Sequence, residues 1–338
     1  MKFKTTALLG AAAAMVLLAG SASAAELACL ITKDNTNPFF VKMKEGAEAA
    51  ATAAGLDFQA YAGVTDGDAA PQITAIENCV TAGAKGILIT PSNDSVGPAL
   101  KEARAAGILV IALDTPLADT EAQDITFATD NFEAGLLIGK WAAATMGEGA
   151  ATAKIAMLDI NKDNISVDVA RDTGFLVGFG IEVPDLKVMG SETDARVIGH
   201  ETSDANPEGG LRAMETLLAK DPDINVVYTI NEPAAEGAYQ ALKAAGKEGQ
   251  AIIVSVDGGC PGVASVKSGV IGATSQQYPL KMASLGIDAI AAFAKDGTKP
   301  TVTEGLSFYN TGVNLVTDKP AEGVPSIDST KGTELCWG

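Results

Sequence analysis

Short apolar runs rich in β-branched residues alternate along the chain with longer segments in which apolar residues recur every three or four positions. The short runs predict strands and the longer segments predict helices. The predicted strands are Leu27–Thr32, Phe58–Ala62, Gly86–Thr90, Ile108–Leu113, Lys154–Ile160, Asn225–Ile230, Ala251–Asp257 and Gly269–Gln276. This alternation is typical of parallel sheets that are covered by helices on both faces.

Proline and glycine mark the ends of the predicted helices. Proline suits the first turn because it has no N–H to leave unbonded, and glycine suits the residue after the last turn. Helix starts are predicted at Asn37-Pro38, Asn206-Pro207, Glu232-Pro233, Cys260-Pro261 and Tyr278-Pro279, and helix ends at Gly55, Gly83, Gly107, Gly246 and Gly297. A further helix is predicted from Asn131, as its N-terminal cap, to about Met146.

The predicted strands form two groups, with about four strand–helix units before Thr126 and about four after Lys154. A chain of 338 residues also exceeds what one hydrophobic core usually holds. We therefore predict an α/β protein of two similar lobes, each built on a doubly wound parallel sheet. The tail from Phe308 to Gly338 has one strand-like run, Gly312–Thr317, and is predicted to wrap one lobe.

The first 24 residues have the order of a secretory signal peptide. Two lysines, Lys2 and Lys4, precede an apolar run from Ala7 to Ala19 and the small residues Ala22-Ser23-Ala24. We predict cleavage after Ala24 and export of a soluble protein. A lipoprotein anchored through Cys29 is disfavoured, because Glu26 stands where that cleavage site needs an aliphatic residue.

The chain is strongly acidic, with 24 Lys and Arg against 42 Asp and Glu and a net charge of −18. Loss of Lys2 and Lys4 with the signal peptide makes the charge −20. Nucleic acid is excluded as a partner because phosphate binding needs an excess of basic residues. A neutral polar ligand fits this charge best.

Four cysteines in an exported chain predict two disulfides, with three possible pairings. The cysteines are Cys29, Cys79, Cys260 and Cys336. None of them forms a CxxC pair, so a zinc site or thiol redox chemistry is not expected.

One predicted helix begins with two large apolar rings, Phe39 and Phe40, directly after the cap Asn37 and Pro38. This helix start lies at the carboxyl end of the first strand, where open α/β sheets bind ligands. The rings, the Asn37 amide and Lys33 are suited to a ligand with an apolar face and hydroxyl groups. The alternative is that both phenylalanines only pack in the core.

Other predicted strands also end at polar residues, which are Asp114, Asn231, Asp257 and Gln277. Each of them could instead cap the helix that follows. As a set they favour a carbohydrate site, because carboxylates and amides pair with hydroxyls while rings cover the C–H face of a sugar.

Catalytic and metal-binding alternatives have little support. Asp114 and Asp257 are candidates for a glycosidase carboxylate pair, but no pattern indicates a raised pKa for either. His200 is the only histidine, which disfavours a hydrolase triad. Asp159–Asn164 lacks the turn glycine and the last glutamate of a calcium loop. The glycines of Gly174–Gly180 do not follow a strand, so close helix packing explains them better than a dinucleotide site.

These residues together resemble the periplasmic sugar-binding proteins of ABC importers, of the ribose-binding type, over nearly all of the chain after the signal peptide. Asn37-Pro38-Phe39-Phe40 matches the NPFF motif of that family, and Asp114 matches the Asp after its fourth strand. Arg171, in Arg171-Asp172-Thr173-Gly174-Phe175, falls on the arginine of its RxxGF motif. The resemblance implies that nine residues bind the ligand: Lys33, Asn37, Phe39, Phe40, Asp114, Arg171, Asn231, Asp257 and Gln277.

The resemblance also implies the type I periplasmic binding protein fold, in which the chain crosses between the lobes three times, here near Asp130, Gln277 and Phe308. One lobe would comprise residues 25–129 and 278–307, and the other residues 130–277 and 308–338. The expected disulfides are then Cys29–Cys79 and Cys260–Cys336, each within one lobe.

Departures from the ribose-binding pattern concern the ligand. Thr115 stands where the ribose binder has an arginine, and the segment from His200 to Gly210 has no clear match for its third stacking ring. Lys33 looks like the lysine that hexose-binding relatives use. The Asp257–Gly262 element and the ending Cys336-Trp337-Gly338 resemble the fructose importer's binding protein in particular.

We therefore expect a periplasmic protein, monomeric and without metal or cofactor, that closes on a monosaccharide such as fructose and delivers it to an ABC transporter permease. One alternative is a sensor that presents a sugar or an autoinducer to a membrane receptor. Another is a sugar-modifying enzyme. A sugar-responsive repressor is disfavoured, because a signal peptide stands where its DNA-binding headpiece would be.

Overall fold

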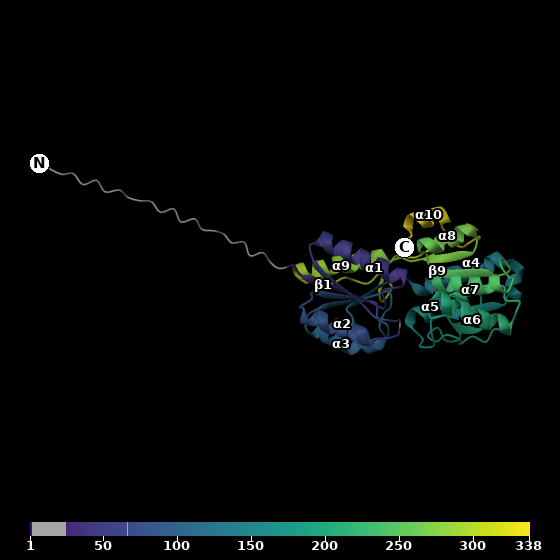
Figure 1. The fold of residues 1–338 in the computed structure, drawn as a ribbon, viewed down its shortest axis with the longest axis horizontal. Coiled ribbons are helices and arrows are strands. Elements are labelled where there is room, and N and C mark those ends of the chain that lie inside the picture. Colours follow the sequence, from purple (N-terminus) through teal and green to yellow (C-terminus); the bar gives the residue numbers. More distant parts are fainter. Residues whose placement is uncertain (2–24, 66) are drawn as a thin grey trace.

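The structure is a computed structural model that describes Met1, residues 25–65 and residues 67–338. The predicted signal peptide lies, apart from Met1, outside the described residues. Figure 1 shows two lobes side by side, each a sheet between layers of helices. No helix in the described part of the chain is both long and apolar enough to cross a membrane. The prediction of two α/β lobes with parallel sheets is confirmed.

The first lobe holds a parallel sheet with the spatial order β11-β5-β4-β3-β1-β2. Its strands are β1 (Leu27–Thr32), β2 (Asp57–Ala62), β3 (Gly86–Ile89), β4 (Leu109–Leu113), β5 (Ile125–Ala128) and β11 (Tyr309–Asn310). Side chains alternate across the sheet, so Leu88 packs under helices α1 (Pro38–Ala54) and α9 (Pro279–Asp296). Its neighbours Ile87 and Ile89 pack under α2 (Ala70–Thr81) and α3 (Gly97–Ala105). Two short 3₁₀ turns, Asp94–Val96 and Thr120–Ala122, complete the connections.

The second lobe repeats this plan with the order β12-β10-β9-β8-β6-β7, in which only the edge strand β12 is antiparallel. Its strands are β6 (Ile155–Asp159), β7 (Val197–Thr202), β8 (Val226–Thr229), β9 (Ile252–Asp257), β10 (Ala273–Gln276) and β12 (Asn314–Val316). Helices α4 (Asn131–Met146) and α5 (Ser166–Phe179) cover one face, and α6 (Pro207–Lys220), α7 (Glu232–Ala244) and α8 (Cys260–Ser268) cover the other. A 3₁₀ segment, Gly147–Thr152, follows α4, and the tail ends with α10 (Ser329–Leu335), which packs on α8.

The chain passes between the lobes three times, after β5, after β10 and after β11. The last passage differs from the expected position near Phe308. Tyr309–Asn310 pairs with β5 in the first sheet, although the predicted boundary placed both residues in the second lobe. The Tyr309 ring packs on Phe127, with 5.0 Å between centroids, and the pairing satisfies backbone groups at the edge of β5.

Helices α4 and α5 approach closely through glycines on both sides. A Cβ atom added at Gly174 would lie 2.3 Å from the carbonyl oxygen of Phe132, and one at Gly178 would lie 2.4 Å from that of Leu136. The packing interpretation of Gly174–Gly180 is therefore confirmed. The cap of α4 is Asp130 rather than the predicted Asn131, because the Asp130 carboxylate accepts from the backbone N–H of Glu133.

Both expected disulfides are present. Cys29 on β1 joins Cys79 on α2 within the first lobe. Cys260 at the start of α8 joins Cys336, which follows α10, so the second disulfide fixes the tail to the second lobe.

Candidate ligand-binding site

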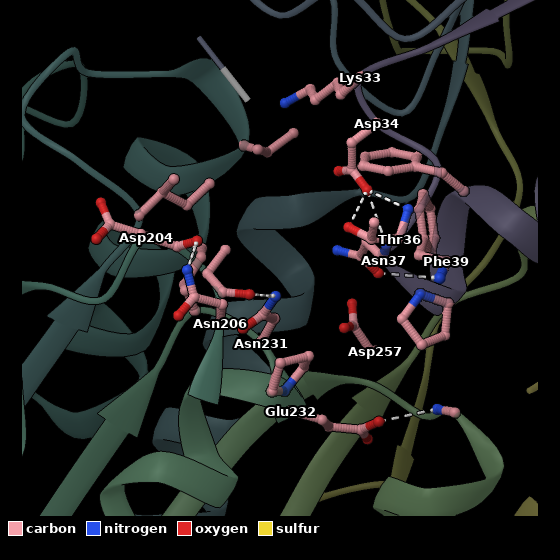
Figure 2. Close-up of a pocket in the computed structure, with 18 of the residues that line it drawn as sticks. Lys33, Asp34, Thr36, Asn37, Phe39, Asp204, Asn206, Asn231, Glu232 and Asp257 are labelled. Atoms are coloured by element: carbon pink, nitrogen blue, oxygen red, sulfur yellow. Dashed lines mark hydrogen bonds between the residues drawn. The ribbon is translucent and has the colours of Figure 1, made fainter. Parts of the chain in front are cut away.

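A cleft of about 780 Å³ lies between the two lobes, at the carboxyl ends of their strands. All nine residues predicted to bind the ligand line this cleft. Figure 2 shows Lys33, Asn37 and Phe39 on one side of it, facing Asn231 and Asp257 on the other. The volume is within the usual range for small-molecule sites.

The start of α1 is held rigidly at the rim of the cleft. The Asp34 carboxylate accepts from the backbone N–H groups of Thr36 and Asn37, both at 2.7 Å. The Asn37 side-chain oxygen in turn accepts from the N–H of Phe39 at 3.0 Å, as the predicted cap. These bonds form the turn that leads into α1 and places the two rings.

Phe39 and Phe40 lie both in the core and in the lining of the cleft. They are 4% and 7% exposed and belong to the core cluster under α1 and α9, yet both also line the cleft. Their rings meet edge to face, with centroids 5.4 Å apart. One edge of the core thus forms the apolar wall of the site.

Arg171 links the second lobe to the first across the cleft. Its Nε donates to Asn131 Oδ1 at 2.8 Å and one terminal nitrogen donates to the carbonyl of Ile230 at 3.1 Å. The other terminal nitrogen lies 3.9 Å from Asp114 Oδ1 in the first lobe. These contacts hold the guanidinium in the cleft, between the two lobes.

Two acceptor atoms in the cleft are buried without a hydrogen-bond partner among the described residues. They are Asp114 Oδ1 and Gln277 Oε1. The other Asp114 oxygen accepts from the Thr115 hydroxyl, and the Gln277 amide nitrogen donates to Asp257 Oδ1 at 2.7 Å. Leaving a buried acceptor unsatisfied costs about 1–3 kcal/mol, so these oxygens favour a ligand that brings hydroxyl donors.

The two carboxylates at the strand ends have unusual backbone geometry. Asp114 has φ of 64° and Asp257 has φ of 139°, a region that residues other than glycine rarely adopt. Such strain persists where surrounding structure enforces it, and it is concentrated at functional sites. It aims both side chains into the cleft instead of along the following helix.

Burial raises the pKa of Asp257 to about 6, and the nearby Asp114 charge adds to the effect, while Arg171 and the Gln277 amide oppose it. Burial and the Asp257 charge likewise raise the pKa of Glu232 to about 8. Glu232 accepts from the backbone N–H groups of Gly258 and Gly259 and from the Thr274 hydroxyl. Its carboxylate therefore orders the loop that leads from Asp257 into α8.

Asn231 caps helix α7, which is the alternative role that the sequence offered for it. Its side-chain oxygen accepts from the N–H of Ala234 at the start of α7, and its amide nitrogen donates to the carbonyl of Ala205. This second bond ties α7 to the loop before α6. The Asn231 amide lines the cleft, and both its oxygen and its nitrogen have a hydrogen-bond partner within the protein.

Several residues that line the cleft were not predicted. They include Asp34, Asp204, Asn206, Glu232 and Trp337. Asn206 and Glu232 stand at predicted helix starts, so the rule that singled out Asn37 also applies to them. Asp204 lies in a loop and has no comparable pattern.

Trp337 adds a further aromatic ring to the lining of the cleft. Its indole N–H donates to the carbonyl of Gln277 at 2.7 Å, and its ring meets Phe39 edge to face with 5.4 Å between centroids. Its own carbonyl accepts from the N–H of Cys260 at 2.8 Å. The tail of the second lobe thus contacts the apolar wall of the first.

The sequence of this chain is similar to a known protein family and to individual proteins of known function. A family model described as periplasmic binding protein domain matches residues 28–299. The ribose import binding protein of Haemophilus influenzae is 32% identical over 285 residues, which cover 84% of this chain and 91% of that protein. These relatives are solute-binding proteins and not enzymes.

Two solved structures have the same fold. An ABC transporter solute-binding protein from Agrobacterium vitis, with bound D-fucose, has a TM-score of 0.75 at 24% identity, over 92% of this chain and 100% of that one. One from Actinobacillus succinogenes, with bound D-allose, has a TM-score of 0.73 at 21% identity, over 91% and 99%. The expected two-lobed type I architecture is therefore shown for this chain.

Proposed function

Because this chain belongs to the periplasmic binding protein domain family, we propose that it captures a monosaccharide between its lobes and delivers it to the permease of an ABC importer. One observation supports this most directly. One cleft between the lobes combines two buried acceptors that lack a hydrogen bond among the described residues, Asp114 Oδ1 and Gln277 Oε1, with the rings of Phe39 and Phe40. Hydroxyl groups and a C–H face, the two surfaces of a sugar, match these two features.

Closure of the lobes is the proposed mechanism. Asp114 lies in the first lobe, Arg171 and Asp257 lie in the second, and a ligand that contacts all of them binds the closed form better than the open form. This difference in affinity is what shifts the population towards closure. The closed shape is then the form that the permease recognises.

The finer part of the proposal is that the ligand is fructose or a related hexose or pentose, and that the protein acts in the periplasm as a monomer. Lys33 in the cleft and Thr115 in place of the ribose binder's arginine support a hexose. The Asp114 and Asp257 carboxylates in the cleft disfavour sugar phosphates because like charges repel.

A thermal-shift panel tests the ligand class. Fructose, ribose and allose at millimolar concentration should raise the melting temperature if they bind the folded state, and amino acids and sugar phosphates should leave it unchanged. A panel in which no neutral sugar shifts the transition would exclude the proposed function.

Calorimetric titration of cleft variants tests the role of both lobes. Arg171→Ala and Asp257→Ala should each weaken sugar binding by about 2–4 kcal/mol, because they leave ligand hydroxyls or buried groups unpaired. Asp223→Ala, an exposed position on the second lobe, is the matched control and should bind normally. Normal affinity in both folded cleft variants would place the ligand on the first lobe alone.

A further inference from the structure

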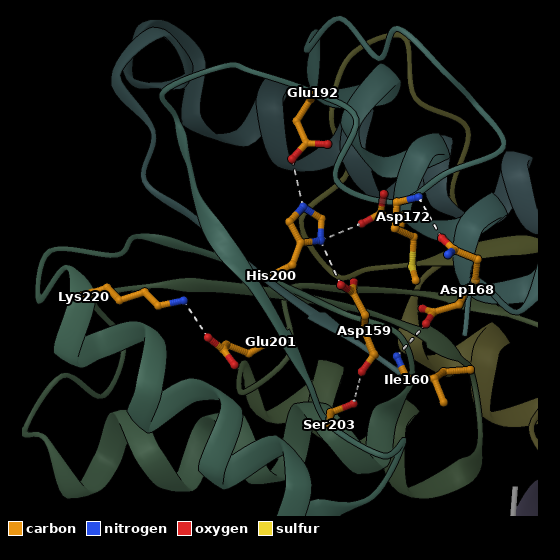
Figure 3. Close-up of polar contacts among 11 residues, drawn as sticks. Asp159, Ile160, Asp168, Asp172, Glu192, His200, Glu201, Ser203 and Lys220 are labelled. Carbon is orange, nitrogen blue, oxygen red and sulfur yellow. Dashed lines mark hydrogen bonds and ion pairs between the residues drawn. The ribbon is translucent and has the colours of Figure 1, made fainter. Parts of the chain in front are cut away.

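A second cluster of polar side chains lies in the second lobe, behind the wall of the cleft. Asp159 ends β6, His200 lies on the edge strand β7, and Asp172 lies on α5 one residue after Arg171. One ligand-type atom from each of these three side chains lies within 4.8 Å of the others. Figure 3 shows the three side chains converging on one point, with Glu192 on the far side of the imidazole.

The imidazole is oriented by a carboxylate on each ring nitrogen. His200 Nδ1 lies 2.8 Å from Asp159 Oδ2 and 3.5 Å from Asp172 Oδ2, and Nε2 lies 2.9 Å from Glu192 Oε1. Histidines that bind metals have this arrangement, with one nitrogen towards the ion and the other donating to a carboxylate that fixes the ring. Glu192 has the position of that orienting carboxylate.

Asp172 gives the second, independent indication of a ligand. Its side chain is 0% exposed, and neither of its carboxylate oxygens has a hydrogen-bond partner among the described residues. One Asp159 oxygen is buried and unpartnered in the same way. The hydroxyl of Tyr228, on the adjacent strand β8, is also fully buried without a partner. Buried polar groups without hydrogen-bond partners require an ordered water or an ion, and carboxylates and an imidazole are groups that bind a cation.

Carboxyl groups are concentrated around this imidazole. Asp159, Asp172 and Glu192 bring three of them to His200, and Asp168 adds a fourth nearby, where it accepts from the N–H of Ile160. A divalent cation bound to Asp159 and Asp172 would neutralise both, and a neutral His200 would then donate its remaining N–H to Glu192.

We propose that Asp159, Asp172 and His200 form a binding site for one divalent transition-metal cation of the Zn²⁺ type, with Glu192 as the positioning residue for the imidazole. The imidazole ligand selects against Ca²⁺ and Mg²⁺, which prefer oxygen ligands alone. The His200 side chain is 21% exposed, which provides a route for the ion from solvent. The site is separate from the sugar site but shares α5 with it.

The test begins with the whole chain after dialysis against a chelator. Addition of Zn²⁺ should give one bound ion per chain by elemental analysis and a higher melting temperature, whereas Ca²⁺ and Mg²⁺ should give neither. Co²⁺ in place of Zn²⁺ should produce visible absorption bands of a site with nitrogen and oxygen ligands. No bound Zn²⁺, or no change on adding it, would overturn the proposal.

Variants locate the ion. Asp172→Asn and His200→Gln should each lower Zn²⁺ affinity at least 100-fold, and Glu192→Gln should lower it about 10-fold to 100-fold. Glu201→Gln is the matched control, since Glu201 is the next residue on β7 and pairs with Lys220 at the surface. Retention of full Zn²⁺ binding by Asp172→Asn and His200→Gln would show that the ion binds elsewhere. Should these variants fail to fold, the Co²⁺ spectrum of the wild-type chain decides the question alone.

Discussion

Several residues that line the cleft were predictable from the sequence because they directly follow a strand. A parallel strand places the residue after it at one edge of the sheet, so the sequence alone was enough to place Asp114 and Asp257 in the cleft between the lobes. Trp337 could not be predicted in this way, because it reaches Phe39 from the far end of the chain and no local pattern links the two. The Asn131 cap was wrong by one residue, since Asp130 and Asn131 are both good caps and only the backbone geometry chooses between them.

Asp257 should make the sugar-free protein less stable as pH rises. Its pKa is raised from 3.8 to about 6, so the folded state holds its proton more tightly than the unfolded state. The contribution of Asp257 to the free energy of unfolding is therefore fully present below about pH 4 and is lost as pH rises through about 6. Asp257→Asn cannot ionise and should be more stable than wild type at pH 8, by on the order of 2–3 kcal/mol, with no difference at pH 4.

Urea unfolding at pH 4 and pH 8 without sugar checks this expectation. Asp223→Asn, at an exposed position, should follow the wild type at both values. Equal stability of Asp257→Asn and wild type at pH 8 would show that Asp257 is not destabilising in the free protein.

Trp337 should contribute to sugar binding. Trp337→Ala removes the ring contact with Phe39 and the bond to the Gln277 carbonyl, and we expect sugar affinity to fall by about 1–3 kcal/mol. Trp337→Phe keeps an aromatic ring and should lose less sugar affinity than Trp337→Ala. Calorimetric titration measures both.

Trp141→Phe is the control for Trp337. The Trp141 indole also donates to a carbonyl at 2.7 Å, that of Lys319, but it lies in the core of the second lobe. This variant should lose stability and keep its sugar affinity. Equal losses of affinity in the Trp141 and Trp337 variants would mean that Trp337 acts only through general stability.

Among the elements, most strands were predicted, including the edge strands β2 and β12, while β5, β7 and β11 were missed. The central strands β1, β3, β4, β8 and β9 are mostly apolar because helices cover both faces. β7 was missed because all its residues are only half-buried. Its polar residues His200 and Glu201 also interrupt the apolar pattern that predicts a strand. β5 was also missed, although all four of its residues are buried. α10 was missed in the tail, where seven mostly polar residues show little helical period.

The α4–α5 contact should be sensitive to a single methyl group. In Gly174→Ala the new Cβ would stand 2.3 Å from a backbone oxygen, so the helices must separate, at a cost of about 1–3 kcal/mol. Gly149→Ala is the control, since a Cβ there would meet only the end of the Met146 side chain at 3.8 Å. Denaturant unfolding compares the two, and equal stability would show that the helices adjust without cost.

For the molecule as a whole, the doubled pattern of strands predicted two lobes, and family resemblance predicted the passages between them. The lobe boundary at the third passage, expected near Phe308, was placed a few residues too early, because the two-residue strand β11 is too short to have a pattern of its own. The contacts between lobes, such as Arg171 with Asp114, depend on the relative placement of two separate cores, which no local pattern specifies.

The two disulfides should differ in function although they are similar in stability. Cys29→Ser and Cys336→Ser each open a loop, of 50 or 76 residues, and each should lose about 4 kcal/mol in the chain-entropy model. Only Cys336→Ser releases the tail that carries Trp337, so only this variant should also bind sugar more weakly. Urea unfolding and titration of both variants separate the two effects. Equal sugar affinity in both would rule out a role for the second disulfide in the cleft.

The pairing of β11 with β5 and of β12 with β10 makes the lobes interleaved along the chain. The first sheet lacks its edge strand until Tyr309–Asn310 has been synthesised, and the second lacks its edge strand until Asn314–Val316 has. Contacts of such long sequence separation form late and slow the folding rate. Nascent chains that stop before residue 309 should therefore remain open to proteolysis in both lobes, and the two lobes should acquire protection together.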